Sequence, residues 1–121
     1  MKFATAALAL LIVAACSANT GAQQAVIHQK QVKLHHLIGA VVDQRGFPVE
    51  YAVVELCDPS NHHVLASTFA DAQGRFSFAD QKRGTQLEIR TSQKGFNTTI
   101  YEVMVREFGR SKIRIVLPVA T

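Results

Sequence analysis

Residues 39–56 read GAVVDQRGFPVEYAVVEL, and this stretch decides the fold. Two apolar runs are separated by a short segment that contains Gly46 and Pro48. Glycine adopts positive φ without a steric penalty and proline fixes φ, so this segment predicts a turn. The run after the turn alternates, and side chains two residues apart point to the same face of a strand. Ala52, Val54 and Leu56 are therefore expected to share one face of that strand.

The alternation of strand and turn continues to the end of the chain. Residues 71–74, DAQG, predict a tight turn, and Phe76 and Phe78 beyond it are expected to face the core. Gly39 indicates a bulge in the first strand. Seven short strands are predicted, at residues 33–43, 50–58, 64–70, 75–79, 85–92, 98–105 and 112–117. This spacing is typical of an all-β fold, a seven-stranded antiparallel β-sandwich, with a closed barrel as the alternative.

Several of these motifs occur together in one known family. They resemble the Gly-x-Val strand, Gly-x-Pro turn, Ala-x-Val strand and Asp-x-x-Gly-x-Phe hairpin of carboxypeptidase regulatory-like domains. In chain order, the matching segments are residues 39–43, 46–49, 52–56, 71–78, 84–89 and 94–96. The chain departs from the family pattern at Gln86 and Phe96, where Tyr is usual. The resemblance implies a transthyretin-like (prealbumin-like) sandwich over about residues 37–117, and it implies no active site.

The first fifteen residues have the composition of a secretion signal. Met1 and Lys2 give a positive start, and residues 3–15 (FATAALALLIVAA) carry no charge. This apolar run is short for a membrane-spanning helix, which needs roughly twenty residues. Residues 13–16, VAAC, resemble a bacterial lipobox, in which the cysteine receives a diacylglycerol and becomes the first mature residue. Cleavage after Ala22 is the alternative, because small residues precede that position as well.

The chain is therefore predicted to have three parts: a signal peptide of the lipoprotein type (1–15), a flexible tether (16–31) and the β-sandwich domain (32–118). A lipid on Cys16 would make the membrane a partner and place the protein in the bacterial cell envelope, as an outer-membrane or periplasm-facing lipoprotein. Ordinary cleavage would instead give a soluble secreted or periplasmic protein. With Cys16 lipidated, Cys57 has no partner within the chain and is expected to be a small, partly buried apolar residue.

Motifs for catalysis are absent from the sequence. It contains no His-Glu-x-x-His pair, so the zinc site of true carboxypeptidases is missing. His35 and His36 are predicted to lie in one strand with their side chains on opposite faces, which hinders shared ligation of a metal. The two tyrosines do not indicate the iron site of intradiol dioxygenases, which needs two Tyr and two His. We therefore expect no catalytic residue, no bound metal and no cofactor.

The formal net charge of the chain is +4, which is mild. Basic residues gather near the C-terminus, at Arg106, Arg110, Lys112 and Arg114. One interpretation is that these cations protect an exposed strand edge from aggregation. The other is that they bind an anionic surface or polymer. Nucleic acid is excluded as a partner because no recognition motif is present and the chain is predicted to be exported.

Together these features predict a non-catalytic exported module that binds a protein or a glycan. Its candidate interaction surface consists of exposed turns, where binding residues commonly lie. The residues nominated for this surface are Asn61, His62, His63 and Lys94. A structural subunit of an envelope complex is the alternative. A small metal-dependent enzyme that uses the His62-His63 turn is a third hypothesis, and it competes with an ordinary solvated turn.

Overall fold

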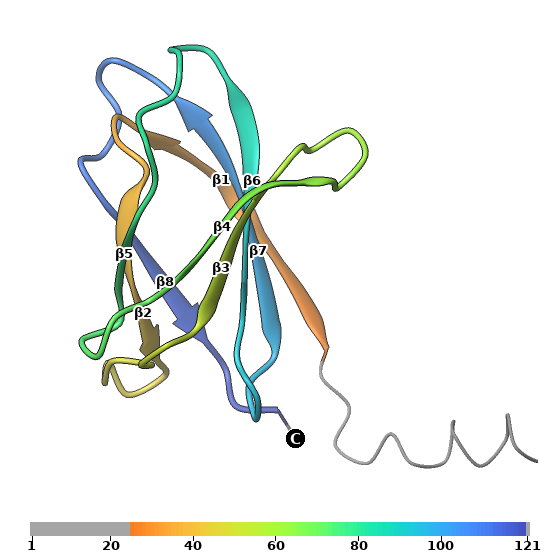
Figure 1. Ribbon diagram of the computed structural model, residues 1–121, viewed down its shortest axis with the longest axis vertical. Helices are drawn as coiled ribbons and strands as arrows, with labels where there is room; N and C mark the ends of the chain where they lie inside the picture. Colours follow the sequence, from red (N-terminus) through yellow and green to blue (C-terminus); the bar gives the residue numbers. More distant parts are fainter. Residues whose placement is uncertain (1–24, 121) are drawn as a thin grey trace, which may run out of the picture.

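The structure, a computed structural model, describes residues 25–120, which form eight β-strands (Figure 1). The predicted signal peptide, the lipid site at Cys16 and the alternative cleavage site at Ala22 lie outside the described residues. In the described part of the chain, no helix is long and apolar enough to span a membrane. The strands are β1 (Val26–Leu34), β2 (Ile38–Asp43), β3 (Val53–Cys57), β4 (Val64–Phe69), β5 (Arg75–Ser77), β6 (Gln86–Ser92), β7 (Thr98–Val105) and β8 (Ile113–Leu117).

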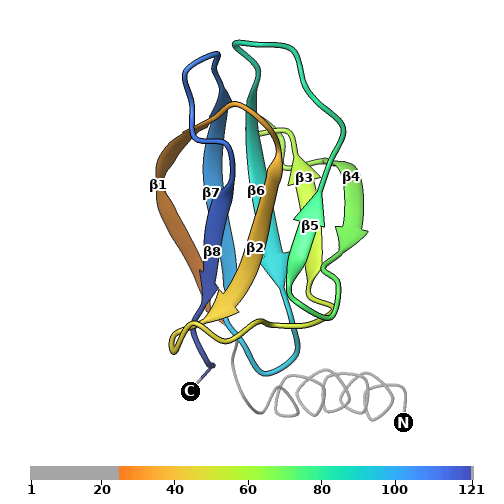
Figure 2. The same cartoon turned by 90° about the vertical axis from the view of Figure 1, so that its left-hand side faces the viewer.

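The strands form two sheets that pack face to face (Figure 2). The larger sheet has the order β1-β7-β6-β3-β4, and the smaller sheet has the order β5-β2-β8. The predicted all-β sandwich is confirmed, but it has eight strands rather than seven. It is also not wholly antiparallel, because β1 pairs with β7 and β2 pairs with β8 in parallel.

The eighth strand arises because the first predicted strand, residues 33–43, divides. His35, His36 and Leu37 form a bend between β1 in the larger sheet and β2 in the smaller one. Leu37 is buried at this bend, and its carbonyl accepts a hydrogen bond of 2.9 Å from the N–H of Phe78. A segment that reads as one strand therefore contributes to both layers of the sandwich.

The predicted tether is wrong over residues 26–31, which belong to β1. Most side chains of this strand are exposed, while Ile27 and Val32 are half-buried and Leu34 is fully buried. As an edge strand β1 has one neighbouring strand, so a few apolar side chains are enough to hold it. A register shift between Gln29 and Val32 also interrupts the alternation, which hides the strand in the sequence.

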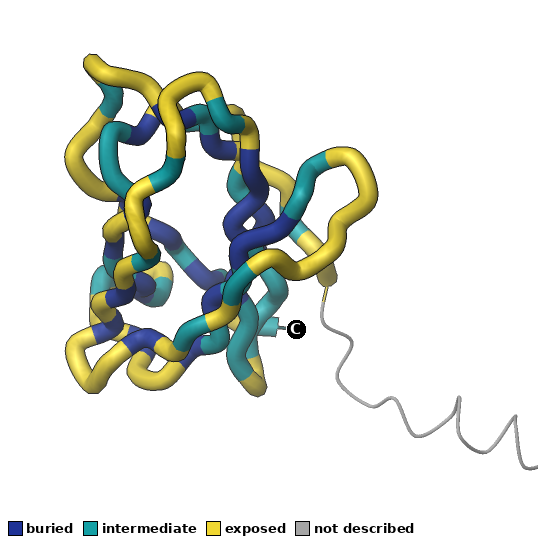
Figure 3. Tube along the Cα trace, turned by 45° about the horizontal axis from the view of Figure 1, so that its top comes forward, coloured by how far each residue is buried: buried dark blue, intermediate teal, exposed yellow. Residues whose placement is uncertain are grey.

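The core lies between the inner faces of the two sheets, as the buried segments in Figure 3 show. Ala52, Val54 and Leu56, which were predicted to share one face of a strand, are all buried. Phe76 is also buried, whereas Phe78 is half-buried and packs against the core from its margin. Full burial of an aliphatic side chain contributes about 1.5–3 kcal/mol to stability. The largest fully buried side chains include Leu34, Leu37, Leu56, Ile89, Ile115 and Leu117.

Gly39 lies in β2 in regular register with both β5 and β8, so the bulge predicted at this position is wrong. The absence of a side chain instead lets the strands approach closely. A Cβ atom at Gly39 would collide with the backbone oxygen of Ile113 and would lie 2.9 Å from Cζ of Phe76. Packing therefore requires glycine here.

Candidate functional site

The nominated turn joins β3 to β4 and is ordered by the carboxylate of Asp58. Its Oδ1 accepts hydrogen bonds from the hydroxyl of Ser60 (2.6 Å) and from the backbone N–H of Ser60 (2.8 Å). These bonds hold the pKa of the Asp58 carboxyl below its ordinary value. The N–H of His63 donates to Oδ1 of Asn61 (3.0 Å), and His62 has a φ of 61°. The turn is therefore shaped by its own polar side chains.

His62 lies over the larger sheet, where Nδ1 donates a hydrogen bond of 2.8 Å to Oε1 of Glu88. The Glu88 side chain is only 6% exposed, while that of His62 is 59% exposed. Glu88 stands between the buried Leu87 and Ile89, so its side chain lies on the opposite face of β6, where the β3–β4 turn covers it. Because a buried carboxylate needs a polar partner, His62 stabilises this part of the sheet.

Cys57 pairs with Glu88 across β3 and β6 and is a free, buried cysteine. Burial raises the pKa of the Cys57 thiol, and the opposing effect of the Arg90 guanidinium is smaller. Nε of Arg90 donates a hydrogen bond of 2.9 Å to Oε1 of Glu55, which raises the pKa of Arg90. A thiol with a raised pKa stays protonated at neutral pH and is a poor nucleophile. The geometry supports a structural Cys57.

The residues nominated from the sequence do not form one surface. Val53 pairs with Ser92 and Cys57 pairs with Glu88, so the turn after β3 and the turn after β6 lie at opposite ends of the larger sheet. Asn61, His62 and His63 belong to the first turn and Lys94 to the second. No group of three or more His, Cys, Asp and Glu side chains that could hold a metal occurs within residues 25–120.

His35 and His36 lie in the bend between β1 and β2, so the prediction that they share a strand is wrong. Their rings pack edge to face, with centroids 4.2 Å apart. Nδ1 of His36 lies 3.0 Å from Oδ1 of Asp80, and Nδ1 of His35 lies 3.3 Å from the carbonyl oxygen of Arg106. Both rings therefore tie the bend to neighbouring loops.

A groove of about 580 Å³ lies beside β1, where its register shifts against β7. We call it the cationic groove. Three cations, two aromatic rings and two amide side chains line it, and its lining contains no Asp or Glu. The lining residues are Gln29, Lys30, Gln31, Val32, Lys33, Tyr101, Phe108, Gly109 and Arg110.

One wall of the cationic groove is the loop 106–110, which follows β7 and is held against the end of β1. Three backbone hydrogen bonds of 2.8–2.9 Å join them: Arg106 N–H to Leu34 O, Arg110 N–H to Lys33 O, and His35 N–H to Arg110 O. Gly109 lies directly on this backbone, since a Cβ there would stand 2.6 Å from the carbonyl carbon of Leu34. The loop therefore presents Phe108, whose side chain is 96% exposed, from a fixed position.

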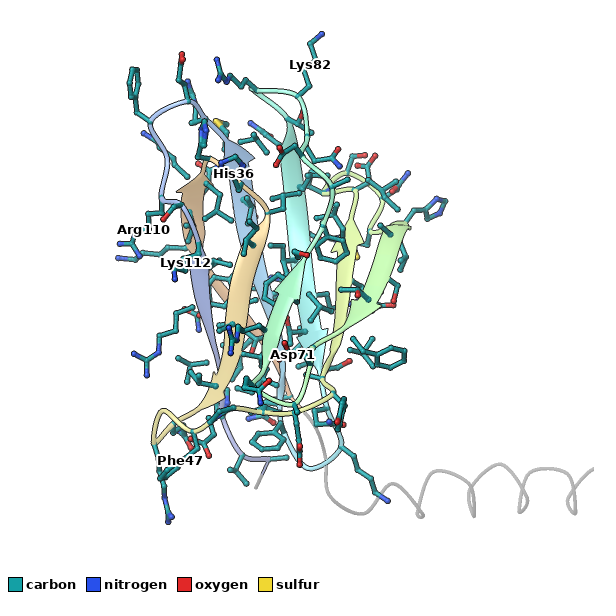
Figure 4. All side chains as sticks on the ribbon, turned by 60° about the vertical axis from the view of Figure 1, so that its left-hand side comes forward. His36, Phe47, Asp71, Lys82, Arg110 and Lys112 are labelled. Carbon is teal, nitrogen blue, oxygen red and sulfur yellow. The ribbon has the colours of Figure 1, made fainter. Side chains whose placement is uncertain are left out.

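The cations of the groove face solvent without a counter-ion. Lys30, Lys33 and Arg110 are exposed and take part in none of the four ion pairs found within residues 25–120. Glu107, the acidic residue of the loop, lies 3.1 Å from Arg83 instead. Arg110 and Lys112 project to the same side of the molecule (Figure 4). Like charges gathered in this way attract an anion.

Sequence reasoning found only part of this site. Arg110 belongs to the basic group noted near the C-terminus, but Lys30 and Lys33 were not connected to it. Because residues 16–31 were interpreted as a tether, the parallel pairing of β1 with β7 was missed. The two apolar residues at 26–27, followed by Val32 and Leu34, were the available signal for an additional strand.

The family model for the carboxypeptidase regulatory-like domain matches residues 36–118, more than half of the chain. The chain belongs to the carboxypeptidase regulatory-like domain family. The match confirms the resemblance carried by the turn and strand motifs. It begins within the bend before β2, so β1 lies outside the part that matches this family. The groove residues that β1 supplies, 29–33, therefore lie outside the segment that matches the family model.

Comparison with curated proteins gave no match. Among solved structures, the chain is similar to 3-chlorocatechol 1,2-dioxygenase from Rhodococcus opacus 1CP, with 12% identity, a TM-score of 0.49, and coverage of 82% of this chain and 67% of that one. Catechol 1,2-dioxygenase from Pseudomonas arvilla C-1 also has 12% identity and a TM-score of 0.49, with 81% and 59% covered. Hydroxyquinol 1,2-dioxygenase from Pseudomonas putida DLL-E4 has 10% identity and a TM-score of 0.48, with 82% and 62% covered. Likenesses of this size carry no argument about activity.

Proposed function

We propose that this protein is a non-catalytic exported binding module, held at the bacterial cell envelope by a lipid on Cys16 and binding its partner through the cationic groove. The observation that carries this proposal is a set of three cations without counter-ions, Lys30 and Lys33 on β1 and Arg110 on the loop that is hydrogen-bonded to it. Preorganised groups bind a partner at a lower entropic cost than mobile ones.

The anchor rests on residues 13–16, VAAC, at the end of the apolar N-terminal run. Two acyl chains on one cysteine bind a membrane far more firmly than a single chain does. The domain begins with β1 at Val26, ten residues beyond Cys16. A lipid at that position would hold the sandwich close to the membrane while the groove stays accessible.

The proposal of a non-catalytic role is supported by the state of the reactive side chains. Cys57 is buried with a raised pKa, and His62 is engaged by the carboxylate of Glu88. A metal-dependent enzyme built on the His62-His63 turn is therefore disfavoured. It would be revived if the purified protein carried stoichiometric metal that a His62→Ala/His63→Ala variant lost.

A structural subunit of an envelope complex remains the second candidate, favoured by the edge strand β4. Its sequence, VLASTF, has no charged residue, and its side chains at Leu65 and Phe69 are 58% and 68% exposed. Free edges of this kind usually carry protecting charges, as β1 does with Lys30 and Lys33. Crosslinking in intact cells separates the candidates: a permanent stoichiometric complex that survives high salt supports the structural subunit.

The anchor is tested by growing a diderm bacterium that expresses the full chain with radiolabelled palmitate. The wild-type protein should incorporate label, and a Cys16→Ser variant should incorporate none. Cys57→Ser is the matched control, because it removes the other cysteine and should leave labelling unchanged. Equal labelling of wild type and Cys16→Ser would exclude the proposed anchor.

A further inference from the structure

We infer that the cationic groove binds an anionic glycan, that is, a sugar polymer bearing carboxylate or phosphate groups. This inference rests on the proposed function, since it names the class of partner that the binding module takes. Four observations carry it: the charge of the groove, the chemistry of its other side chains, the interrupted edge of β1, and the place of the groove relative to the start of the domain.

The charge of the groove selects an anion. Lys30, Lys33 and Arg110 line it, no Asp or Glu does, and Glu107 on the same loop lies against Arg83. A guanidinium binds carboxylate or phosphate oxygens through paired hydrogen bonds, and an ammonium adds an adaptable donor. A cleft lined by one sign of charge also concentrates the opposite ion at its surface.

The uncharged side chains favour a sugar over a bare anion. The amides of Gln29 and Gln31 offer donors and acceptors that match sugar hydroxyls, and the rings of Tyr101 and Phe108 offer flat apolar faces. The electron-rich face of an aromatic ring attracts the C–H groups on the apolar side of a pyranose. Phe108 is 96% exposed and is not among the residues packed against the core, so core packing does not explain a large apolar side chain at this position.

The interrupted edge of β1 disfavours an acidic peptide as the partner. A peptide that bound by strand addition would need an unbroken run of free backbone groups along the edge. The register of β1 shifts between Gln29 and Val32, within the groove, and such irregularities hinder the pairing of another strand. A ligand recognised by its hydroxyl and acidic groups does not need a regular edge.

The direction of β1 favours a polymer over the headgroups of the anchoring membrane. β1 runs parallel to β7, so Val26 lies at the end opposite to Leu34 and the loop 106–110. A nine-residue strand spans roughly 30 Å. A chain anchored at Cys16 therefore has its Val26 end near the membrane and presents the loop with Phe108 towards material that lies off the membrane.

The test uses the full chain purified in detergent and isothermal titration with defined probes. Polygalacturonate supplies a carboxylated sugar, and methyl-esterified polygalacturonate supplies the same ring without charge. Polyglutamate supplies an acidic polypeptide, and vesicles of phosphatidylglycerol in phosphatidylcholine supply an anionic membrane. We expect polygalacturonate to bind at least about tenfold more tightly than its methyl ester, in a manner weakened by salt, and more tightly than polyglutamate.

Two pairs of variants locate the binding. Lys33→Gln/Arg110→Gln should weaken polygalacturonate binding by about tenfold, while Arg45→Gln/Arg75→Gln, with the same change in net charge at exposed positions elsewhere, should change it less than about twofold. Phe108→Ala should weaken it by about fivefold, and Phe47→Ala, which removes another exposed ring, should not. Circular dichroism checks that each variant is folded. The comparison of the four probes uses wild-type protein alone, so it tests the inference even if a variant fails to fold.

Equal binding of polyglutamate and polygalacturonate would overturn the inference, because the groove would then recognise charge alone. Equal weakening by both charge pairs would also overturn it. If Lys33→Gln/Arg110→Gln weakened vesicle binding but left polygalacturonate binding unchanged, the groove would be assigned to membrane binding instead. These binding measurements do not depend on whether Cys16 carries a lipid. If the glycan inference fails, the palmitate experiment still tests the lipid anchor of the proposed function separately.

Discussion

Gly109 lies on the backbone of Leu34 so closely that a Cβ atom would stand 2.6 Å from the Leu34 carbonyl carbon. The two residues are far apart in sequence, one in the loop after β7 and the other at the end of β1. Their contact holds the loop 106–110 against β1 and so builds one wall of the cationic groove. The shape of the groove therefore depends on a residue that has no side chain.

A Gly109→Ala substitution should displace this loop. The added methyl group would meet backbone atoms, which yield less readily than a flexible side chain, and overpacking of this kind costs about 1–3 kcal/mol. We expect a lower melting temperature and weaker binding of polygalacturonate, measured by calorimetry. Ser111→Ala, at an exposed neighbouring position, is the control and should match wild type. An unchanged melting temperature and affinity for Gly109→Ala would show that the close contact is unimportant.

A Gly39→Ala substitution should destabilise the fold without involving the groove. Its methyl group would meet the backbone of Ile113 and the ring of Phe76, between two strands of the smaller sheet. We expect the melting temperature to fall by roughly 5–20 °C. Ser77→Ala, in β5 with an exposed side chain, should leave it nearly unchanged. A Gly39→Ala protein as stable as wild type would contradict the packing described for β2.

Cys57 should react slowly with thiol reagents in the folded protein. Its side chain is buried, and burial raises the pKa of the thiol, so little thiolate is present at neutral pH. Titration with a chromogenic disulfide should show slow modification of the native chain and rapid modification in guanidinium chloride. A Cys57→Ser/Ser67→Cys variant, which moves the thiol to an exposed position on β4, should react rapidly when folded. Rapid reaction of native Cys57 would rule out its assignment as a structural residue.

The β3–β4 turn should loosen in acid. Hydrogen bonds from Ser60 lower the pKa of the Asp58 carboxyl in the folded protein. The contribution of Asp58 is therefore fully present above the pKa it has in the unfolded chain, and it is lost as the pH falls through the lowered folded value. Nuclear magnetic resonance should show the Ser60 amide shifting over this acidic range. Asp58→Asn should abolish that transition, and an identical transition in the variant would assign it to another group.

The fold was predictable where the strand pattern and turn chemistry agreed. Residues 98–105 were predicted as a strand and form β7 with the same limits, because β-branched and other apolar residues follow the turn at residues 93–95. Ala52, Val54 and Leu56 were predicted to share one face of a strand, and all three are buried. In contrast, the bend at His35–Leu37 has neither Gly nor Pro, so nothing local showed that the chain changes sheets there.

The site was less predictable because it depends on pairing between distant segments. The parallel contact of β1 with β7 brings Lys30 and Lys33 beside Arg110, and no local pattern encodes that contact. The register of β3 and β6 likewise decides that Lys94 is remote from His62, although both lie in exposed turns. The burial of Glu88 also depends on the neighbouring turn, whose His62 lies 2.8 Å from its carboxylate.

Mass spectrometry of the mature N-terminus decides whether the chain is an envelope module anchored by lipid. The protein should be expressed as the full chain in a diderm bacterium and extracted from its membranes. We expect the first residue to be Cys16 and to carry the added mass of a diacylglyceryl group. A mature protein that begins at Gln23 and carries no lipid would contradict this expectation.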